Sequence, residues 1–255
     1  MLTLNIFKIK TMIGFIVLPL GAAGVTFVCN RYHISYEMGT IARAFFGGVF
    51  FTFAITLSTV NKRRFDAFDE IAILKGNALT FHQLFKLYFK GEQLADAQNN
   101  LLQLFINLHA GLRTPDLRLS SSALHEVDKV LNQLMTHIYQ LKQQGLHPPE
   151  VSRLYQWHQD IYKSSERLVA IKEHNIPVLL RVFIRYSMLI SIFVLAPDFV
   201  HLGNFGILLS AMLCFMVVTL LSIQDHLEDP FDDDVDSVCF DFYDRLKIRM
   251  NAKFF

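Results

Sequence analysis

Cysteine is scarce in this sequence, and no spacing that defines a metal-binding or disulfide-bonded module is present. Two of the three cysteines, Cys29 and Cys214, lie at or inside apolar segments, where they are most simply packing residues. The sequence also lacks a phosphate-binding loop, a dinucleotide fingerprint, an H-E-x-x-H motif and a Ser-His-Asp signature. These absences argue against an enzyme, because no residue set for nucleophilic or metal-dependent catalysis can be identified.

Neither sign of charge is in excess. The chain carries 24 basic and 23 acidic residues, which gives a net charge of +1. No strongly charged partner is therefore indicated, and no basic domain or nucleic-acid-binding motif is present. No segment of any weight alternates polar and apolar residues as a half-buried strand does. The sequence therefore predicts an all-α protein without a nucleic-acid partner.

Hydrophobic residues, in contrast, are abundant and gathered in blocks. They make up 52% of the chain and include 24 phenylalanines. Four blocks are long enough to form membrane-spanning helices, which need about 17–25 residues; they are 12–29, 38–60, 178–196 and 205–223. The first block could instead be a cleaved signal peptide. It lacks a polar region before a small-residue cleavage site, so an uncleaved span is the preferred interpretation.

Basic residues near the ends of the spans predict their orientation. Most of them fall on one side, and these are Lys8, Lys10, Lys62, Arg63, Arg64, Lys172, Arg181 and Arg185. The opposite side has only Arg31 and Arg43. We therefore expect both termini, and the long segment between the second and third spans, to lie in the cytoplasm.

The segment 61–176 is predicted to form a cytoplasmic helical domain. Apolar residues recur at helical spacing in four stretches, 65–89, 93–112, 123–144 and 150–174. The breaks between them carry Gly91, Gly111, Pro115, Gly145, Pro148 and Pro149. The predicted organisation is two spans in 1–60, the helical domain in 61–176, two further spans in 177–224, and an acidic turn with a C-terminal helix in 225–255.

Several charged groups allow two interpretations. Asp232, Asp234 and Asp236 have the 1-3-5 spacing of a calcium loop, and Asp233 adds a further carboxylate, but the complete EF-hand pattern is absent. These acids could bind calcium, or they could cap the next helix and face water. Arg181 and Arg185 in the third span could act in function, or extend to the membrane surface. No cofactor is otherwise indicated.

The second span continues directly into a basic segment. Residues 44–60 carry no charge, and Lys62, Arg63 and Arg64 follow. Phe51, Ile55 and Thr59 are four apart and share one face of the helix, while Thr52 and Thr56 form a neighbouring row. A row of this kind usually faces lipid or another helix, although a narrow apolar ring can also gate a pore by dewetting.

Three segments together resemble the bestrophin family of oligomeric anion channels, which has a bacterial branch. The first follows the second span and contains Asn61, Phe68, Glu70 and Gly76; the second contains Glu166, Arg167 and Pro177 before the third span; the third contains Asp229, Pro230 and Phe231 after the fourth. Each motif is weak alone. Their order and spacing across four spans make the set fairly specific, and the resemblance covers nearly the whole chain.

The resemblance implies a bestrophin-like homo-pentamer whose second spans surround an axial pore. Phe51, Ile55 and Thr59 occupy the places of the family's pore neck. Leu146 lies near the place of a second, cytoplasmic constriction, and the acids Asp232–Asp236 resemble the calcium clasp of animal members. The sequence departs from the family at Asp232, Asn175 and Thr59, which bears on selectivity and on the wettability of the neck more than on the fold.

We therefore expect a chloride channel of a bacterial inner membrane, in contact with lipid, with its own copies and with inorganic anions. Passive permeation would be aided by basic residues near the pore mouths, which are Arg43, Lys62, Arg63 and Arg64. The alternative is a non-conducting membrane-anchored scaffold or sensor whose helical cytoplasmic domain binds a partner.

Overall fold

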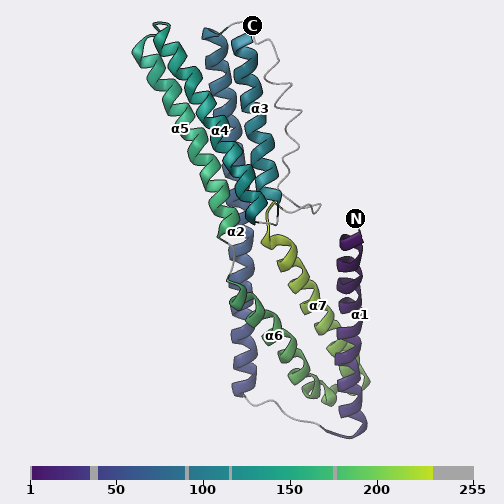
Figure 1. Cartoon of the computed structure of the whole chain (residues 1–255). Helices are drawn as coiled ribbons and strands as arrows, with labels where there is room; N and C mark the ends of the chain where they lie inside the picture. Colours follow the sequence, from purple (N-terminus) through teal and green to yellow (C-terminus); the bar gives the residue numbers. More distant parts are fainter. Residues whose placement is uncertain (1, 35–39, 90–91, 115–116, 175–176, 232–255) are drawn as a thin grey trace. The chain divides into compact units, whose positions relative to one another are not determined.

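The computed structural model describes residues 2–34, 40–89, 92–114, 117–174 and 177–231 (Figure 1). Within these residues the chain is helical and contains no strand, as predicted. The elements are α1 (Leu2–Arg31), α2 (Thr40–Tyr88), α3 (Glu92–Arg113), α4 (Leu117–Gln143), α5 (Pro148–Glu173), α6 (Val178–Leu195), the 3₁₀ helix η1 (Ala196–Leu202) and α7 (Asn204–Glu228).

The chain divides into two compact units. Unit 1 comprises Met1–Lys62 and Ile176–Glu228, and unit 2 comprises Arg63–Asn175 and Asp229–Phe255. Helix α2 belongs to both, because it continues without a break from one unit into the other. No glycine or proline stands between Val60 and Phe65, so nothing in the sequence ends the helix where the apolar block stops.

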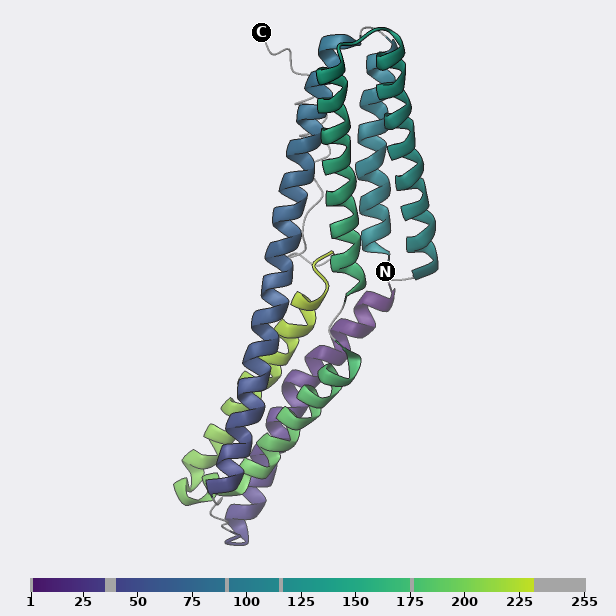
Figure 2. The ribbon, with the colours of Figure 1, turned by 90° about the vertical axis from the view of Figure 1, so that its left-hand side faces the viewer.

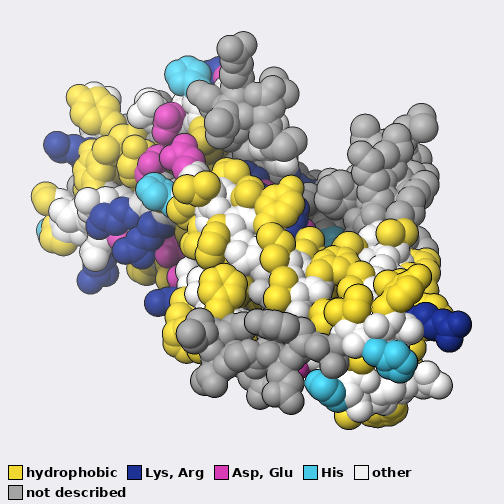
Figure 3. Space-filling view, turned by 90° about the horizontal axis from the view of Figure 1, so that it is seen from below, with side chains coloured by type: hydrophobic (Ala, Val, Ile, Leu, Met, Phe, Trp, Pro, Cys, Tyr) yellow, Lys and Arg dark blue, Asp and Glu magenta, His cyan; other side chains and the backbone are white. Residues whose placement is uncertain are grey.

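Unit 1 contains membrane-spanning helices. Four helices of the described residues are long and apolar enough to cross a membrane, namely α1, α2, α6 and α7, which confirms the four predicted spans. The inner faces of these helices pack into one hydrophobic cluster, formed by Ala22, Val49, Phe53, Ile184, Met188, Ile192, Cys214, Val217, Val218 and Leu221. Their outer faces also carry large apolar side chains, and hydrophobic side chains cover much of the described surface in Figure 3. The protein is therefore a membrane protein.

The short connection between α6 and α7 is itself helical. It forms the 3₁₀ helix η1, with Pro197 in its first turn, and ends at Gly203, whose φ of 58° lies in the left-handed region. Thr26 of α1 holds this element, because its hydroxyl lies 3.3 Å from the carbonyl oxygen of Ala196. Proline at the start and glycine at the end favour an ordered turn over an irregular loop.

Unit 2 is a bundle of α3, α4, α5 and the second part of α2 (Figure 2). Its core is large and apolar and includes Leu74, Phe81, Phe85, Leu101, Leu104, Leu108, Leu131, Leu134, Ile138, Leu154, Ile161 and Leu168. The helices of unit 2 begin and end within a few residues of the predicted breaks. Gly111 lies inside α3 and is buried, and Pro148 and Pro149 begin α5, where the fixed φ of proline suits the first helical turn.

His158 of α5 links two helices of unit 2. Its Nε2 lies 2.9 Å from the carbonyl oxygen of Leu131 on α4, which makes the imidazole the donor. Burial lowers the pKa of His158 below its ordinary value of 6.5, and the bond to Leu131 opposes this only in part. The folded protein therefore binds a proton at this site less readily than the unfolded chain does.

We expect His158→Gln to weaken the acid sensitivity of unit 2. Because the folded pKa is depressed, the stabilisation from neutral His158 is present above about pH 6.5 and is lost as the pH falls from there toward the folded pKa. The measurement is the thermal unfolding midpoint of the purified protein from pH 8 to pH 5. The variant should show a smaller drop than wild type, whereas substitution of the exposed His125 by glutamine should not. Equal drops in all three proteins would contradict the assignment.

Gly206 provides a steric test of unit 1. A Cβ atom at this position would lie 1.9 Å from the carbonyl oxygen of Phe199. This is a steric clash that only a movement of the backbone could relieve. We expect Gly206→Ala to lower the thermal unfolding midpoint and the yield of folded protein, measured by size-exclusion chromatography in detergent. Gly24→Ala is the control, because nothing lies within 4 Å of the added carbon. Equal behaviour of the two variants would show that η1 and α7 do not pack this closely.

Candidate functional site

The row of Phe51, Ile55 and Thr59 lies on a face of α2 that unit 1 does not bury. Phe51 is 68% exposed and Ile55 52% exposed, and Thr59 is also exposed. The opposite face of the same helix is closed, with Val49, Phe53, Thr56 and Val60 all buried. The row of Thr52 and Thr56 differs from the row of Phe51, Ile55 and Thr59, because it lies toward the packed side of the helix, where Thr52 is half-buried and Thr56 is buried.

Small residues flank the exposed row. Gly47, Gly48, Ala54 and Ser58 are exposed on the same helix, and nothing lies within 4 Å of a Cβ placed on either glycine. Small residues on a membrane helix allow another helix to approach closely. This part of α2 therefore combines large side chains and small flanks on a surface that one copy of the chain leaves open.

The basic residues after the neck differ in their surroundings. Lys62 is exposed, whereas Arg63 and Arg64 are half-buried. Arg63 donates through Nη2 to the carbonyl oxygen of Ile171 at 2.6 Å, and the guanidinium of Arg64 lies 5.8 Å from the ring centroid of Phe68. Both arginines thus make structural contacts, and Lys62 remains the exposed cation of the run. Arg43 lies in the first turn of α2.

Two exposed acids follow on α2, and the sequence reasoning missed them. Asp66 and Asp69 are exposed in unit 2. They stand four and seven residues after Lys62, which itself stands three residues after Thr59, so they continue the same helical spacing. This spacing in the sequence was sufficient to place both acids on the same side of the helix as Lys62. Any surface built on this side of α2 is therefore mixed in charge beyond Lys62.

One residue of the first motif segment, Glu70, meets one residue of the second, Arg167, in unit 2. Glu70 is 7% exposed, and its Oε2 accepts from Nη1 of Arg167 at 3.3 Å. Its other oxygen, Oε1, is buried and has no hydrogen-bond partner. Of the other residues of these two motifs, Asn61, Phe68, Gly76 and Glu166 are exposed. Pro177 directly precedes α6, where it caps the start of the helix.

The second and third segments are joined by a group that we call the junction cluster, made of Arg63, Ile171, Lys172, Asp229 and Phe231. Lys172 donates to Asp229, and the other oxygen of Asp229 accepts from the backbone N–H of Phe231 at 3.0 Å. Phe231 is 1% exposed and packs in the core of unit 2, next to the buried Pro230. The ends of α5 and of the segment after α7 are therefore fixed to each other and to Arg63 of α2.

The arginines of the third span are paired. Arg181 donates to Glu228, and Arg185 donates to Asp225; the two arginines lie on α6 and the two acids on α7. Of the two interpretations left open by the sequence, these contacts favour a structural one, because each of the two arginines has a partner of opposite sign.

Leu146 follows α4 and packs, half-buried, against the core of unit 2; its N–H donates to the carbonyl oxygen of Leu141 at 3.1 Å. The role of Leu146 as a constriction stays a prediction. The acids Asp232, Asp233, Asp234 and Asp236 lie outside the described residues, and so does the predicted calcium site.

We expect loss of the lysine in the junction cluster to destabilise the protein more than loss of an exposed lysine elsewhere in unit 2. The Lys172 side chain is 17% exposed, so Lys172→Ala removes a partly buried cation that donates a hydrogen bond to the Asp229 carboxylate. We expect the free energy of unfolding to fall by about 1–2 kcal/mol. Lys163→Ala breaks an exposed pair 3.9 Å long with Asp160 and should cost under about 0.5 kcal/mol. Denaturant titration of both variants measures the difference, and equal losses would contradict a stabilising junction.

Sequence comparisons do not assign the chain to a family. No family model matches the sequence, and no curated protein matches it.

Solved structures, in contrast, share its fold. A crystal structure of a variant of a bacterial bestrophin homologue from Klebsiella pneumoniae has a TM-score of 0.82 at 12% identity, over 95% of this chain and 100% of that chain. The structure of this homologue solved by Zn-SAD phasing has a TM-score of 0.77 at 11% identity, over 96% and 97% of the two chains. The resemblance predicted from the three motif segments is thereby confirmed at the level of the fold: this chain has the fold of the bacterial bestrophin homologues.

Proposed function

We propose that the protein forms a homo-pentameric channel in which the exposed row of Phe51, Ile55 and Thr59 surrounds a central pore and anions, chloride among them, permeate passively. The observation that carries this proposal is the exposure of that row on a helix whose other face is fully packed. A membrane helix with one closed face and one open face needs lipid, water or a second copy on the open face. The bestrophin-like fold favours copies arranged around an axis.

The neck would act through its size and polarity. Phe51 and Ile55 would present apolar rings, which can close a narrow pore by dewetting. Thr59 donates its hydroxyl hydrogen to the carbonyl oxygen of Ile55 at 3.0 Å, so its oxygen is left to accept hydrogen bonds at the inner end of the neck. Lys62, exposed one turn further on, would raise the local anion concentration.

In a bacterial inner membrane, this arrangement would place both termini and unit 2 in the cytoplasm. The support is the excess of lysine and arginine on that side of the spans.

Cation conduction is the second candidate, because Asp66 and Asp69 are exposed beyond Lys62 on α2. Carboxylates near a pore mouth attract cations and repel anions. Lys62 would favour anions at the pore mouth, whereas Asp66 and Asp69 would favour cations. A reversal potential separates the two possibilities.

The test is conduction by purified full-length protein in lipid bilayers under a potassium chloride gradient. An anion channel reverses near the chloride equilibrium potential; reversal near the potassium potential would establish the cation candidate instead. We expect Ile55→Ala to raise the conductance severalfold, because it widens the apolar neck. Ile190→Ala is the matched control, since Ile190 is an isoleucine of α6 with 59% exposure and lies outside the proposed pore.

No current from a confirmed oligomer would contradict conduction and would favour the scaffold interpretation. Equal effects of Ile55→Ala and Ile190→Ala would contradict the placement of the neck.

A further inference from the structure

Arg63 is fixed to another helix at the point where the proposed neck ends. The neck residues are four apart on α2, and Arg63 follows Thr59 at the same spacing. Thr59 is exposed, whereas Arg63 is half-buried, and its Nη2 donates to the carbonyl oxygen of Ile171 on α5 at 2.6 Å. The exposed row therefore leads directly into a side chain that is bound within unit 2.

The acceptor on α5 suits a cation. Ile171 lies in the last turn of this helix, where the carbonyl groups lack a partner within the helix and the helix dipole is negative. A charged donor also makes a stronger hydrogen bond than a neutral one does. The contact thus satisfies a carbonyl at the end of α5 and joins that end to α2.

A carboxylate on a third segment supports the same arginine. The negative charge of Asp229, which directly follows α7, interacts favourably with the charge of Arg63. Asp229 is itself fixed, because one oxygen accepts from Lys172 and the other from the backbone N–H of Phe231. Phe231 in turn is 1% exposed in the core of unit 2. The groups around Arg63 are therefore fixed, which limits rotation of α2 at this turn.

The two adjacent basic residues Lys62 and Arg63 differ in what their charges can do. Lys62 is exposed, so its charge acts on ions in the surrounding water. The guanidinium of Arg63 contacts a carbonyl oxygen and is partly offset by a carboxylate, so it contributes less to the field beyond it. Arg63 is therefore placed to fix the helix, and Lys62 to attract ions.

We propose that Arg63 is a positioning residue, which fixes the rotation of α2 at the inner end of the neck and so sets the direction in which Thr59 faces. No glycine or proline lies between the two residues, and α2 is continuous there, so a rotation at Arg63 reaches Thr59 directly. The consequence for gating rests on the proposed channel. The orientation of Thr59 can be measured without any current.

The first test is the rate at which N-ethylmaleimide, an uncharged reagent, labels Thr59→Cys in the full-length protein in detergent. Mass spectrometry measures the rate, and wild type gives the background from its native cysteines. We expect Arg63→Met and Arg63→Lys each to change the rate severalfold. Lysine keeps the charge but lacks the guanidinium geometry, so a change in Arg63→Lys cannot come from lost charge. An unchanged rate in both variants, or in Arg63→Lys alone, would overturn the proposal.

The second test separates position from charge by recording currents in lipid bilayers. Arg63→Met should change the open probability severalfold and leave the reversal potential unchanged. Lys62→Met should shift the reversal potential, because it removes an exposed charge. A shift of the reversal potential in Arg63→Met, with an unchanged open probability, would assign Arg63 to ion attraction and overturn the proposal.

Asp229→Asn provides an independent variant, since it weakens the hold on Arg63 without removing the arginine. It should change the labelling of Thr59→Cys in the same direction as Arg63→Met, so the proposal can be tested even where Arg63→Met does not fold. In the Arg63→Met background it should have little further effect, because both changes remove the same interaction. Additive effects of the two changes would contradict a shared role.

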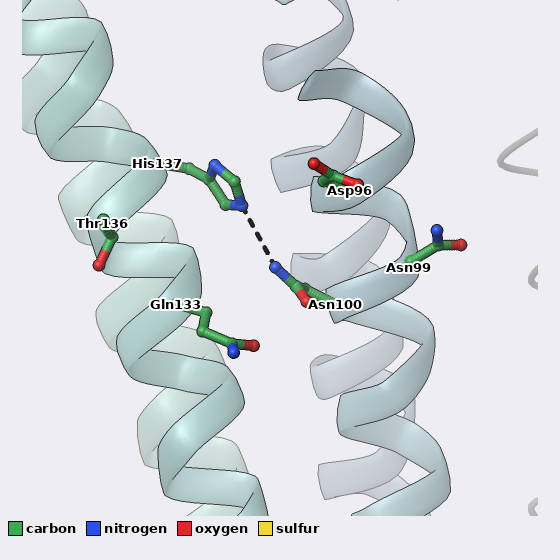
Figure 4. A pocket seen from close by; sticks show the side chains of 6 residues that line it. All are labelled: Asp96, Asn99, Asn100, Gln133, Thr136 and His137. Atoms are coloured by element: carbon green, nitrogen blue, oxygen red, sulfur yellow. Dashed lines mark hydrogen bonds between the residues drawn. The ribbon is translucent and has the colours of Figure 1, made fainter. Parts of the chain in front are cut away.

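A polar contact between α3 and α4 supplies the matched control. Figure 4 shows Asn100 and His137 pointing toward one another, and Nδ2 of Asn100 lies 3.2 Å from Nε2 of His137. Asn100→Ala removes this hydrogen bond, which joins two helices of unit 2 other than α2. It should leave the labelling rate of Thr59→Cys and the open probability unchanged. Equal changes in Asn100→Ala and Arg63→Met would indicate general loosening of unit 2 and overturn the proposal.

Failure of the channel and failure of this role have different signatures. If wild type carries no current while Arg63→Met still changes the labelling of Thr59→Cys, conduction is contradicted and the positioning role stands. If wild type conducts while Arg63→Met changes neither the labelling nor the open probability, the positioning role is overturned and conduction stands. Size-exclusion chromatography and circular dichroism of each variant establish that it is folded and assembled.

Discussion

The open face of α2 is the constraint on which the rest of the structure depends. This helix runs unbroken for 49 residues and uses one side for packing in unit 1, where Val49, Phe53, Thr56 and Val60 are buried. The other side keeps Phe51 and Ile55 exposed. Backbone groups within a helix are satisfied internally, so only side chains decide what covers that face. The proposed oligomer answers this demand with further copies of the same helix.

The three motif segments owe their spacing to contacts within unit 2. Glu70 meets Arg167, Lys172 meets Asp229, and Phe231 is inserted into the core. Segments far apart in sequence therefore converge, which gives a structural reason for residues that each looked unremarkable alone. The arginines of α6 are paired in the same way in unit 1, where Glu228 and Asp225 of α7 supply the opposite charge.

Hydrophobic pattern was sufficient to predict the helices and the four spans, because burial in lipid and in a helical bundle imposes long apolar segments with simple periods. It was less exact at the ends of the helices, where local chemistry decides. Pro148 and Pro149 begin a helix, Gly111 packs inside one, and the connection between α6 and α7 is the 3₁₀ helix η1. That Phe51, Ile55 and Thr59 share one face of the helix follows from their four-residue spacing, whereas the ion pair of Glu70 with Arg167 depends on which helices face each other.

A single-particle structure of the purified oligomer in a lipid nanodisc tests the proposed pore most directly. We expect five copies around one axis, with the side chains of Phe51, Ile55 and Thr59 from every copy facing a continuous central path. An oligomer in which Ile55 faces lipid, or one whose second helices leave no path along the axis, would contradict it.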